Sequence, residues 1–252
     1  PKPSSAASDV YKRQPQPPVN SGRYEGSLTM TARRQDQVSH FAVETFVATT
    51  GSALNWVCDK LKWFQNAQEI SALAATAESA GGVTFIPALT GLRVPRMEAG
   101  ARASLTGISM ATTQAEVAYA ILEGIAHSVA SCIEADEEVS GVQVSELVVG
   151  GGLSCSDPLL RIQADLLGIP IRRMQEADRA SLRGVAFLAG ASGLFWPSLQ
   201  AARDTAATDA VFLPSLEADA RARRRALWHS RVESELAHAG LYPHDKQEAL
   251  RT

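Results

Sequence analysis

LVVGGGLSCSDP, residues 147–158, places an apolar triplet, a run of glycines and a helix start in one short stretch. Leu147–Val149 predicts a short buried strand, and Asp157-Pro158 predicts an N-cap followed by proline as the first residue of a helix. The glycines lack a Cβ, so their backbone can pass close to a flat or anionic ligand in front of the helix N-terminus. A plain strand-to-helix turn would need the same glycines. A dinucleotide fingerprint would need glycine at Cys155 and a Walker loop would need a lysine, so the stretch matches neither of these nucleotide loops.

The sequence downstream continues the alternation of helices and strands. The first helix is expected to end at Gly168, and the strand Ile169–Arg172 is expected at a sheet edge because Pro170 cannot donate to a ladder. Two more helices follow, Ala180–Phe195 with many small residues and Leu216–Ala239 with its arginines outside. The expected inward positions of the last helix are Leu227, Trp228, Val232 and Leu236.

The sequence upstream shows the same alternation. The expected elements are a strand at Phe41–Val47, a turn at Thr49–Ser52, helices at Leu54–Leu61 and Ile70–Ala80, and strands at Val83–Ile86 and within Leu105–Ile108. Thr113 and Glu116 form a capping box, which predicts the start of a buried helix of about six turns. Alternating strands and helices predict an α/β fold.

Composition narrows the class of protein. The chain has 252 residues, of which 45% are hydrophobic and 20% charged, and its formal net charge is −3. Such a chain can bury a sizeable core but lacks a basic surface for nucleic acid, and we expect the basic run Arg221–Arg225 on a solvated helix face. Three separated cysteines favour reduced thiols over disulfides or a zinc site, and no segment has the ~20 apolar residues of a membrane span. We expect a cytoplasmic protein without a nucleic-acid or membrane partner.

Two terminal segments are expected to lie outside the folded domain. Residues 1–24 are rich in Pro, Ser and Gly, and Ser4–Gln14 reads back into codons that resemble a DNA sequencing adaptor. The segment is therefore expected to be artefactual or disordered, with true coding sequence from about Pro15. We expect one folded domain over residues 25–240 and a disordered tail over residues 241–252.

Several motifs follow one another in a fixed order. They are FAVETFVATTGSALNW (41–56), FIPALTGLRVP (85–95), ARASLTGIS (101–109), AYAILEGIAHSV (118–129), LVVGGGLSCSDPLLRIQADLLGIPI (147–171) and LRGVAFLAGASGLFW (182–196). The series resembles the C-terminal domain of the FGGY carbohydrate kinases, most closely their glycerol kinase branch. The resemblance covers about Glu25–Ala239.

This resemblance implies an actin-like ATPase fold of the ribonuclease H type, with a mixed sheet flanked by helices. The chain would be the second of the usual two domains. ATP and Mg²⁺ would lie in the cleft between the domains, and a polyol or sugar would be held mainly by the first domain. The family's nucleotide contacts carry over to Gly51, Asn55, Gly151, Gly152 and Ser156. Asn55 and Ser156 are shorter donors than the glutamine and asparagine usual in glycerol kinases.

Other positions differ from the family or have simpler interpretations. Gly150 replaces an aspartate usual in glycerol kinases, and Glu98 stands where a loop aspartate is common, whereas Arg102 matches. Glu123 is expected to be a helix-surface or capping acid rather than a catalytic one, and His127 is expected to be a satisfied buried or half-buried imidazole.

Asp165, which matches the family, is expected to brace packing rather than to bind magnesium. No catalytic or metal-binding residue is assigned, because the family's general base and acceptor site precede the stretch that corresponds to Glu25. The chain is therefore expected to be a fragment with one side of an ATP cleft, inactive alone.

The parent protein would transfer phosphate from ATP to a polyol or sugar hydroxyl. Two alternatives stay open: a sugar kinase of the xylulose or ribulose type, and a non-catalytic module that binds a nucleotide or a partner protein. A homo-oligomeric assembly is compatible with the kinase function and with both alternatives. Two structural expectations follow: Thr49–Ser52 and Gly150–Ser156 should converge, and an apolar patch should be exposed near Gly51 and over residues 85–110.

Overall fold

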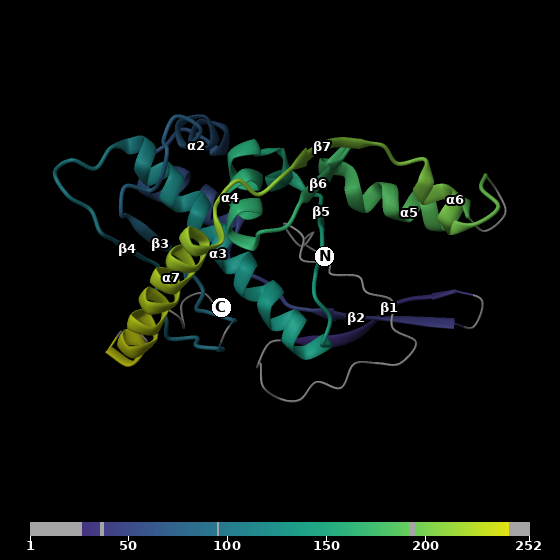
Figure 1. Cartoon of the computed structure of the whole chain (residues 1–252), viewed down its shortest axis with the longest axis horizontal. Coiled ribbons are helices and arrows are strands. Elements are labelled where there is room, and N and C mark those ends of the chain that lie inside the picture. Colours follow the sequence, from purple (N-terminus) through teal and green to yellow (C-terminus); the bar gives the residue numbers. More distant parts are fainter. Residues whose placement is uncertain (1–26, 36–37, 95, 192–194, 242–252) are drawn as a thin grey trace.

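The computed structural model describes residues 27–35, 38–94, 96–191 and 195–241, arranged as in Figure 1. The described strands are β1 (Leu28–Gln35), β2 (Val38–Glu44), β3 (Thr84–Ile86), β4 (Ser104–Thr106), β5 (Leu147–Val149), β6 (Ile171–Met174) and β7 (Thr208–Phe212). The described α-helices are α1 (Gly51–Trp56), α2 (Ala67–Ala74), α3 (Gln114–Ser140), α4 (Asp157–Leu167), α5 (Ala180–Gly190), α6 (Leu199–Asp204) and α7 (Ala218–His238). The expected artefactual segment, with Ser4–Gln14, and all of the expected tail except Leu241 lie outside the described residues.

Helix α3 forms the centre of the core. Its N-cap Thr113 accepts a bond from the Glu116 N–H, and the Glu116 carboxylate accepts one from the Thr113 N–H, so the predicted capping box is confirmed. The helix has 27 residues, about seven and a half turns rather than six, and ends where Gly141 adopts a φ of 68°. Its length and composition would suffice to cross a bilayer, but 78% of its most apolar window is buried inside the protein. The protein thus uses α3 as a core helix.

The middle of α3 packs against β3, α2 and α4. Ile121, Leu122 and Ile125 are fully buried there, and each stabilises the fold by about 1.5–3 kcal/mol. A Cβ at Gly124 would collide with the carbonyl oxygen of Phe85, so this glycine lets β3 approach the helix closely.

The described strands form three small sheets. β1 and β2 make an antiparallel hairpin, β3 and β4 make a second antiparallel pair, and β5 pairs with β6 in parallel while β7 joins β6 antiparallel. The expected mixed sheet is therefore present. The edge position expected for the strand at Ile169–Arg172 is wrong, because β6 is the central strand. Pro170 precedes β6, so its missing N–H costs the ladder nothing, and its carbonyl accepts from the Leu147 N–H at 3.0 Å.

The chain before α1 forms a hairpin that extends from the body beside α5 and α6 (Figure 1). The expected strand Phe41–Val47 is shifted toward the N-terminus, since β2 ends at Glu44. Strand β1 was not expected: Leu28, Met30 and Ala32 alternate with threonines, but the second half of the strand is polar throughout. A register shift between Thr31 and Arg33 interrupts the pairing further.

Two predicted helices end earlier than expected. α2 begins after the N-cap Asn66, whose side chain accepts from the Glu69 N–H, and it stops at Ala74 instead of Ala80. Gly81 and Gly82, which follow the expected helix, have φ values of 58° and 86° and turn the chain into β3. α5 stops at Gly190 rather than Phe195, and residues 192–194 lie outside the described part of the chain.

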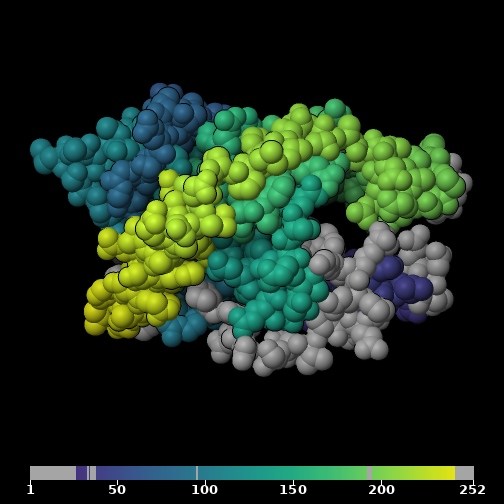
Figure 2. Space-filling view, in the orientation of Figure 1, coloured from purple at the N-terminus to yellow at the C-terminus, as the bar shows by residue number. Residues whose placement is uncertain are grey.

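Helix α7 crosses the α3 side of the molecule, and Figure 2 shows it in yellow against the teal core. Trp228 and Val232 are buried and Leu236 is partly buried, as expected, but Leu227 is 48% exposed, so its inward position is wrong. The solvated face expected for the basic run is wrong at Arg225, which is 7% exposed and lies among polar groups of α3.

Exposed apolar side chains lie partly where they were expected. Over residues 85–110 they are Met97, Ile108 and Met110, whereas beside Gly51 the exposed residues are Ser52 and Asn55, which are polar. Helix α5 exposes Leu182, Val185 and Leu188, a row that the sequence did not single out. Both helices α5 and α6 project to one side of the body (Figure 1).

Candidate functional site

The glycine turn after β5 lies against the start of α1. A Cβ built at Gly51 would lie 3.9 Å from Cγ of Leu153, which sits in the short 3-10 helix Gly152–Cys155. The two glycine-containing turns, far apart in the sequence, therefore converge as expected. α1 continues into a π-helical turn at Val57–Leu61, so the predicted helix over Leu54–Leu61 is confirmed with an irregular second half.

The three glycines of the turn, residues 150–152, differ in their backbone conformation and in the space around them. Gly151 adopts a φ of 90°, which L side chains rarely reach, and its N–H donates to the Ala177 carbonyl at 2.6 Å. A Cβ at Gly152 would meet nothing within 4 Å, so the backbone here faces open space. A Cβ at Gly150 would lie 2.7 Å from Cβ of Ala180. The aspartate usual at this position in glycerol kinases therefore has no room beside Ala180.

Ser156, rather than Asp157, is the N-cap of α4. Its Oγ accepts from the Leu159 N–H at 3.4 Å, and Asp157 and Pro158 become the first two helical residues. The expected cap is thus wrong by one position, because serine and aspartate both favour this place. The Ser156 hydroxyl also lies 2.7 Å from Oγ of Ser71 on α2. Asn55 is exposed on α1, on the same segment as Gly51.

Arg173 on β6 fixes the base of the glycine turn. Its guanidinium donates to the Ser154 carbonyl at 2.9 Å, to Oδ1 of Asp157 at 2.8 Å and to Oδ2 of Asp209 at 2.6 Å. Burial alone would lower the pKa of Arg173, but its bonds to Asp157 and Asp209 outweigh that effect and raise it. Both Arg173 and Ser71 were missed in the sequence, since their partners are distant in the chain.

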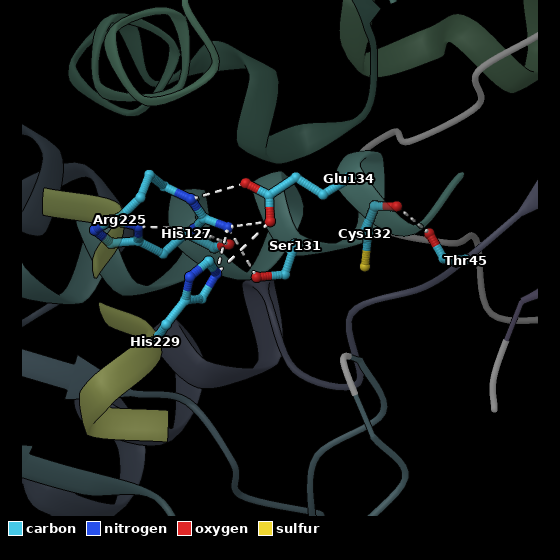
Figure 3. A network of polar contacts seen from close by, with 7 residues as sticks. All are labelled: Thr45, His127, Ser131, Cys132, Glu134, Arg225 and His229. Carbon is cyan, nitrogen blue, oxygen red and sulfur yellow. Dashed lines mark hydrogen bonds and ion pairs between the residues drawn. The ribbon is translucent and has the colours of Figure 1, made fainter. Parts of the chain in front are cut away.

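Helix α7 is anchored by a polar network around the buried Arg225, which Figure 3 shows. Arg225 donates to both carboxylate oxygens of Glu134 at 3.1 and 2.7 Å and to Oγ of Ser131 at 3.1 Å. It also lies 3.0 Å from Nδ1 of His127 and 3.1 Å from Nε2 of His229. The guanidinium thereby joins the last described helix to the middle of α3.

The ring of His127 is buried and stacks on Trp228 with centroids 4.9 Å apart. Burial, followed by the charge of Arg225, lowers the pKa of His127 well below its usual value. A neutral imidazole accepts at Nδ1 from the arginine and carries its proton on Nε2. The expectation of a satisfied buried histidine is confirmed.

The remaining acids have structural partners. Asp165 accepts from the N–H and Oγ of Ser215 at 2.6 and 3.0 Å and from the Leu216 N–H at 3.0 Å, which is the packing role expected. The surface position expected for Glu123 is wrong: its side chain is 14% exposed and lies 3.3 Å from Arg224. Burial raises the pKa of Glu123, and the arginine partly offsets this.

The loop positions matched to the family are also held locally. Glu98 accepts from the Gly100 N–H at 2.8 Å, and Arg102 donates to the carbonyl oxygen of Gly100 at 3.0 Å. Neither contact joins this loop to the glycine turn. Within residues 27–35, 38–94, 96–191 and 195–241, no group of three or more His, Cys, Asp or Glu side chains could hold a metal ion.

The chain is similar to known kinases over most of its length. Residues 14–193 match the FGGY family of carbohydrate kinases, C-terminal domain. The glycerol kinase of Clavibacter michiganensis subsp. michiganensis is 36% identical over 204 residues, 81% of this chain and 40% of that protein. The glycerol kinase of Myxococcus xanthus is 37% identical over 218 residues, 86% of this chain and 43% of that protein.

Solved structures give the same result. The crystal structure of Plasmodium falciparum glycerol kinase with ADP matches with a TM-score of 0.77 and 28% identity over 84% of this chain and 42% of that chain. Gluconate kinase from Lactobacillus acidophilus shares the fold, with a TM-score of 0.70 and 23% identity over 89% of this chain and 44% of that chain. The chain thus has the expected actin-like ATPase fold and spans about two fifths of the length of these relatives. By these matches it belongs to the FGGY family of carbohydrate kinases, as a chain that carries the family's C-terminal domain.

Proposed function

We propose that this domain forms the nucleotide-binding side of an ATP-dependent kinase that phosphorylates a hydroxyl of a polyol such as glycerol. The observation that carries the proposal is the proximity of the start of α1 at Gly51 to the glycine turn at Leu153. The similarity to glycerol kinases, one of them solved with ADP, supports a nucleotide as the ligand of this face.

The proposed nucleotide contacts are of three kinds: glycine backbone, short polar side chains and the N–H groups of a helix start. Gly51, Gly151 and Gly152 carry no Cβ, so the nucleotide can approach their backbone closely. At Gly152 the space in front of the backbone is open, because a Cβ there would meet nothing within 4 Å. Asn55 and Ser156 supply short polar side chains for the nucleoside. The N–H groups at the start of α4 favour an anionic group nearby. When bound, ATP would supply the phosphoryl group that is transferred.

Phosphoryl transfer also needs a proton acceptor and usually Mg²⁺. The described residues offer no cluster of metal ligands, so we assign neither the metal site nor the general base to them. Mg²⁺, a sugar or polyol acceptor, fragment status and a homo-oligomeric assembly stay predictions. The cytoplasmic location also stays a prediction, and the free thiols of Cys58, Cys132 and Cys155 support it.

Calorimetric titration of the 252-residue chain with ADP tests the proposal. We expect measurable binding, and we expect Gly152→Leu to weaken it at least about tenfold because the new side chain would enter the ligand space. Gly184→Leu on α5 is the matched control, because a Cβ there also meets nothing within 4 Å. Absence of ADP binding, or equal loss in both variants, would contradict the proposed site.

A further inference from the structure

Ser71 lies on α2, outside the segments that carry the proposed nucleotide contacts. Its hydroxyl oxygen is 2.7 Å from that of Ser156, across 85 positions of the sequence. Serines inside helices often bond to a carbonyl one turn earlier, as Ser128 does with the Gly124 carbonyl at 2.8 Å. Ser71 instead reaches to the neighbouring helix and touches the residue that begins α4.

The hydroxyls of Ser71 and Ser156 carry two protons between them. Each serine hydroxyl has one proton and can accept two bonds. One of the two protons lies between Ser71 and Ser156, and either oxygen can be its donor. Whichever serine donates, the proton on the other hydroxyl remains for a third group. Ser156 also accepts from the Leu159 N–H, which uses one of its lone pairs but no hydroxyl proton.

Both side chains are positioned to serve a ligand. Ser71 and Ser156 are each half-buried, so their hydroxyls are held by packing yet are not sealed inside the core. α2 contacts α4 directly, and the 3-10 helix that leads to Ser156 carries Leu153, whose Cγ lies 3.9 Å from the position of a Cβ built at Gly51. Three separate segments therefore meet around the Ser156 hydroxyl.

We propose that Ser71 is a positioning residue of the nucleotide site, which orients the Ser156 hydroxyl toward an acceptor atom of the nucleoside of a bound nucleoside diphosphate. This inference rests on the proposed function and adds α2 to the site. Ser71 lowers the entropy cost of binding because its bond holds the short Ser156 side chain in one rotamer before the nucleotide arrives. The pair thereby presents a single oriented hydroxyl proton.

Titration of the 252-residue chain with ADP tests this inference. We expect Ser71→Ala to weaken ADP binding by about three- to tenfold, the usual effect of one neutral hydrogen bond. Ser71→Thr retains the hydroxyl and should bind within about twofold of the wild type. In a Ser156→Ala background, Ser71→Ala should have no further effect, because the hydroxyl that it orients is already gone.

Ser128→Ala is the matched control, since it also removes a half-buried helical serine hydroxyl, and it should leave ADP binding unchanged. Thermal unfolding without nucleotide shows whether each variant is folded. Wild-type binding with an unchanged Ser71→Ala variant would overturn this inference and leave the proposed function intact. Loss in Ser71→Ala that persists equally in the Ser156→Ala background would also overturn it, since the serines would then act independently. No ADP binding by the wild type would overturn both.

Discussion

Asp136 is a carboxylic acid that the fold buries, at a cost in free energy when it is ionised. It lies on α3, is 1% exposed, and accepts at Oδ2 from Oγ1 of Thr45 at 3.1 Å. Its Oδ1 has no hydrogen-bond partner within the part of the chain that the structure describes. Burial raises the pKa of Asp136 from 3.8 to about 7, the hydrogen bond from Thr45 opposes this rise, and the charge of Glu44 adds to it.

The sign of the pH dependence follows from this shift. Since the folded state binds the Asp136 proton more tightly than the unfolded state, stability is lost as the pH rises from about 4 to about 7. A shift of about three pKa units corresponds to about 4 kcal/mol in total, of which about 3 kcal/mol falls between pH 5 and pH 8. Asp136→Asn keeps the shape and cannot ionise.

Urea unfolding at pH 5 and pH 8 measures the effect. Between pH 5 and pH 8, we expect the free energy of unfolding of Asp136→Asn to fall by about 3 kcal/mol less than that of the wild type. Comparing the two proteins removes the contributions of His127 and other groups that titrate in the same range. The matched control Asp219→Asn, an exposed position on α7, should keep the wild-type pH dependence. Equal pH dependence in Asp136→Asn and the wild type would refute the reasoning.

Three further perturbations test packing and the site. Gly150→Asp should destabilise the domain by about 1–3 kcal/mol because the new side chain would collide with Ala180. In denaturant unfolding, the double variant with Ala180→Gly should recover part of the lost stability. Arg225→Met should cost about 1–3 kcal/mol because it removes the hydrogen bonds to the buried Ser131 and His127 as well as the ion pair with the half-exposed Glu134. Arg225→Lys should not fully restore stability, since lysine cannot form both bonds to Glu134 at once. An effect below 1 kcal/mol would contradict the importance of this network. Ser156→Ala should cost about 1 kcal/mol through the lost cap and should also weaken ADP binding, so a stability loss with unchanged ADP affinity would contradict its role in the site.

Elements specified by local chemistry could be predicted from the sequence. The capping box at Thr113 and Glu116 identified the start of α3, and the glycine at 168 identified the end of α4, because both depend on contacts a few residues apart. The convergence of Gly51 with the glycine turn was inferred from the family resemblance, since no local pattern shows it.

Features that depend on distant partners could not be predicted. Arg225 was placed in solvent because the sequence shows its charged neighbours but not the polar groups of α3 that receive it. The hydroxyl of Ser71 meets Ser156 across 85 positions, and no periodicity reports such a pair. β6 was mistaken for an edge strand because Pro170 is informative only once its position before the strand is known.

Helix α7 begins 25 residues after the stretch that matches the family ends, at residues 218 and 193 respectively. During synthesis, Ser131 and Glu134 leave the ribosome well before Arg225, which donates a hydrogen bond to each of them. Until Arg225 follows, this side of α3 is an open polar face that a chaperone or solvent must cover. A chain stopped at residue 193 would keep the whole stretch that matches the family and still lack α7, which supplies Arg225.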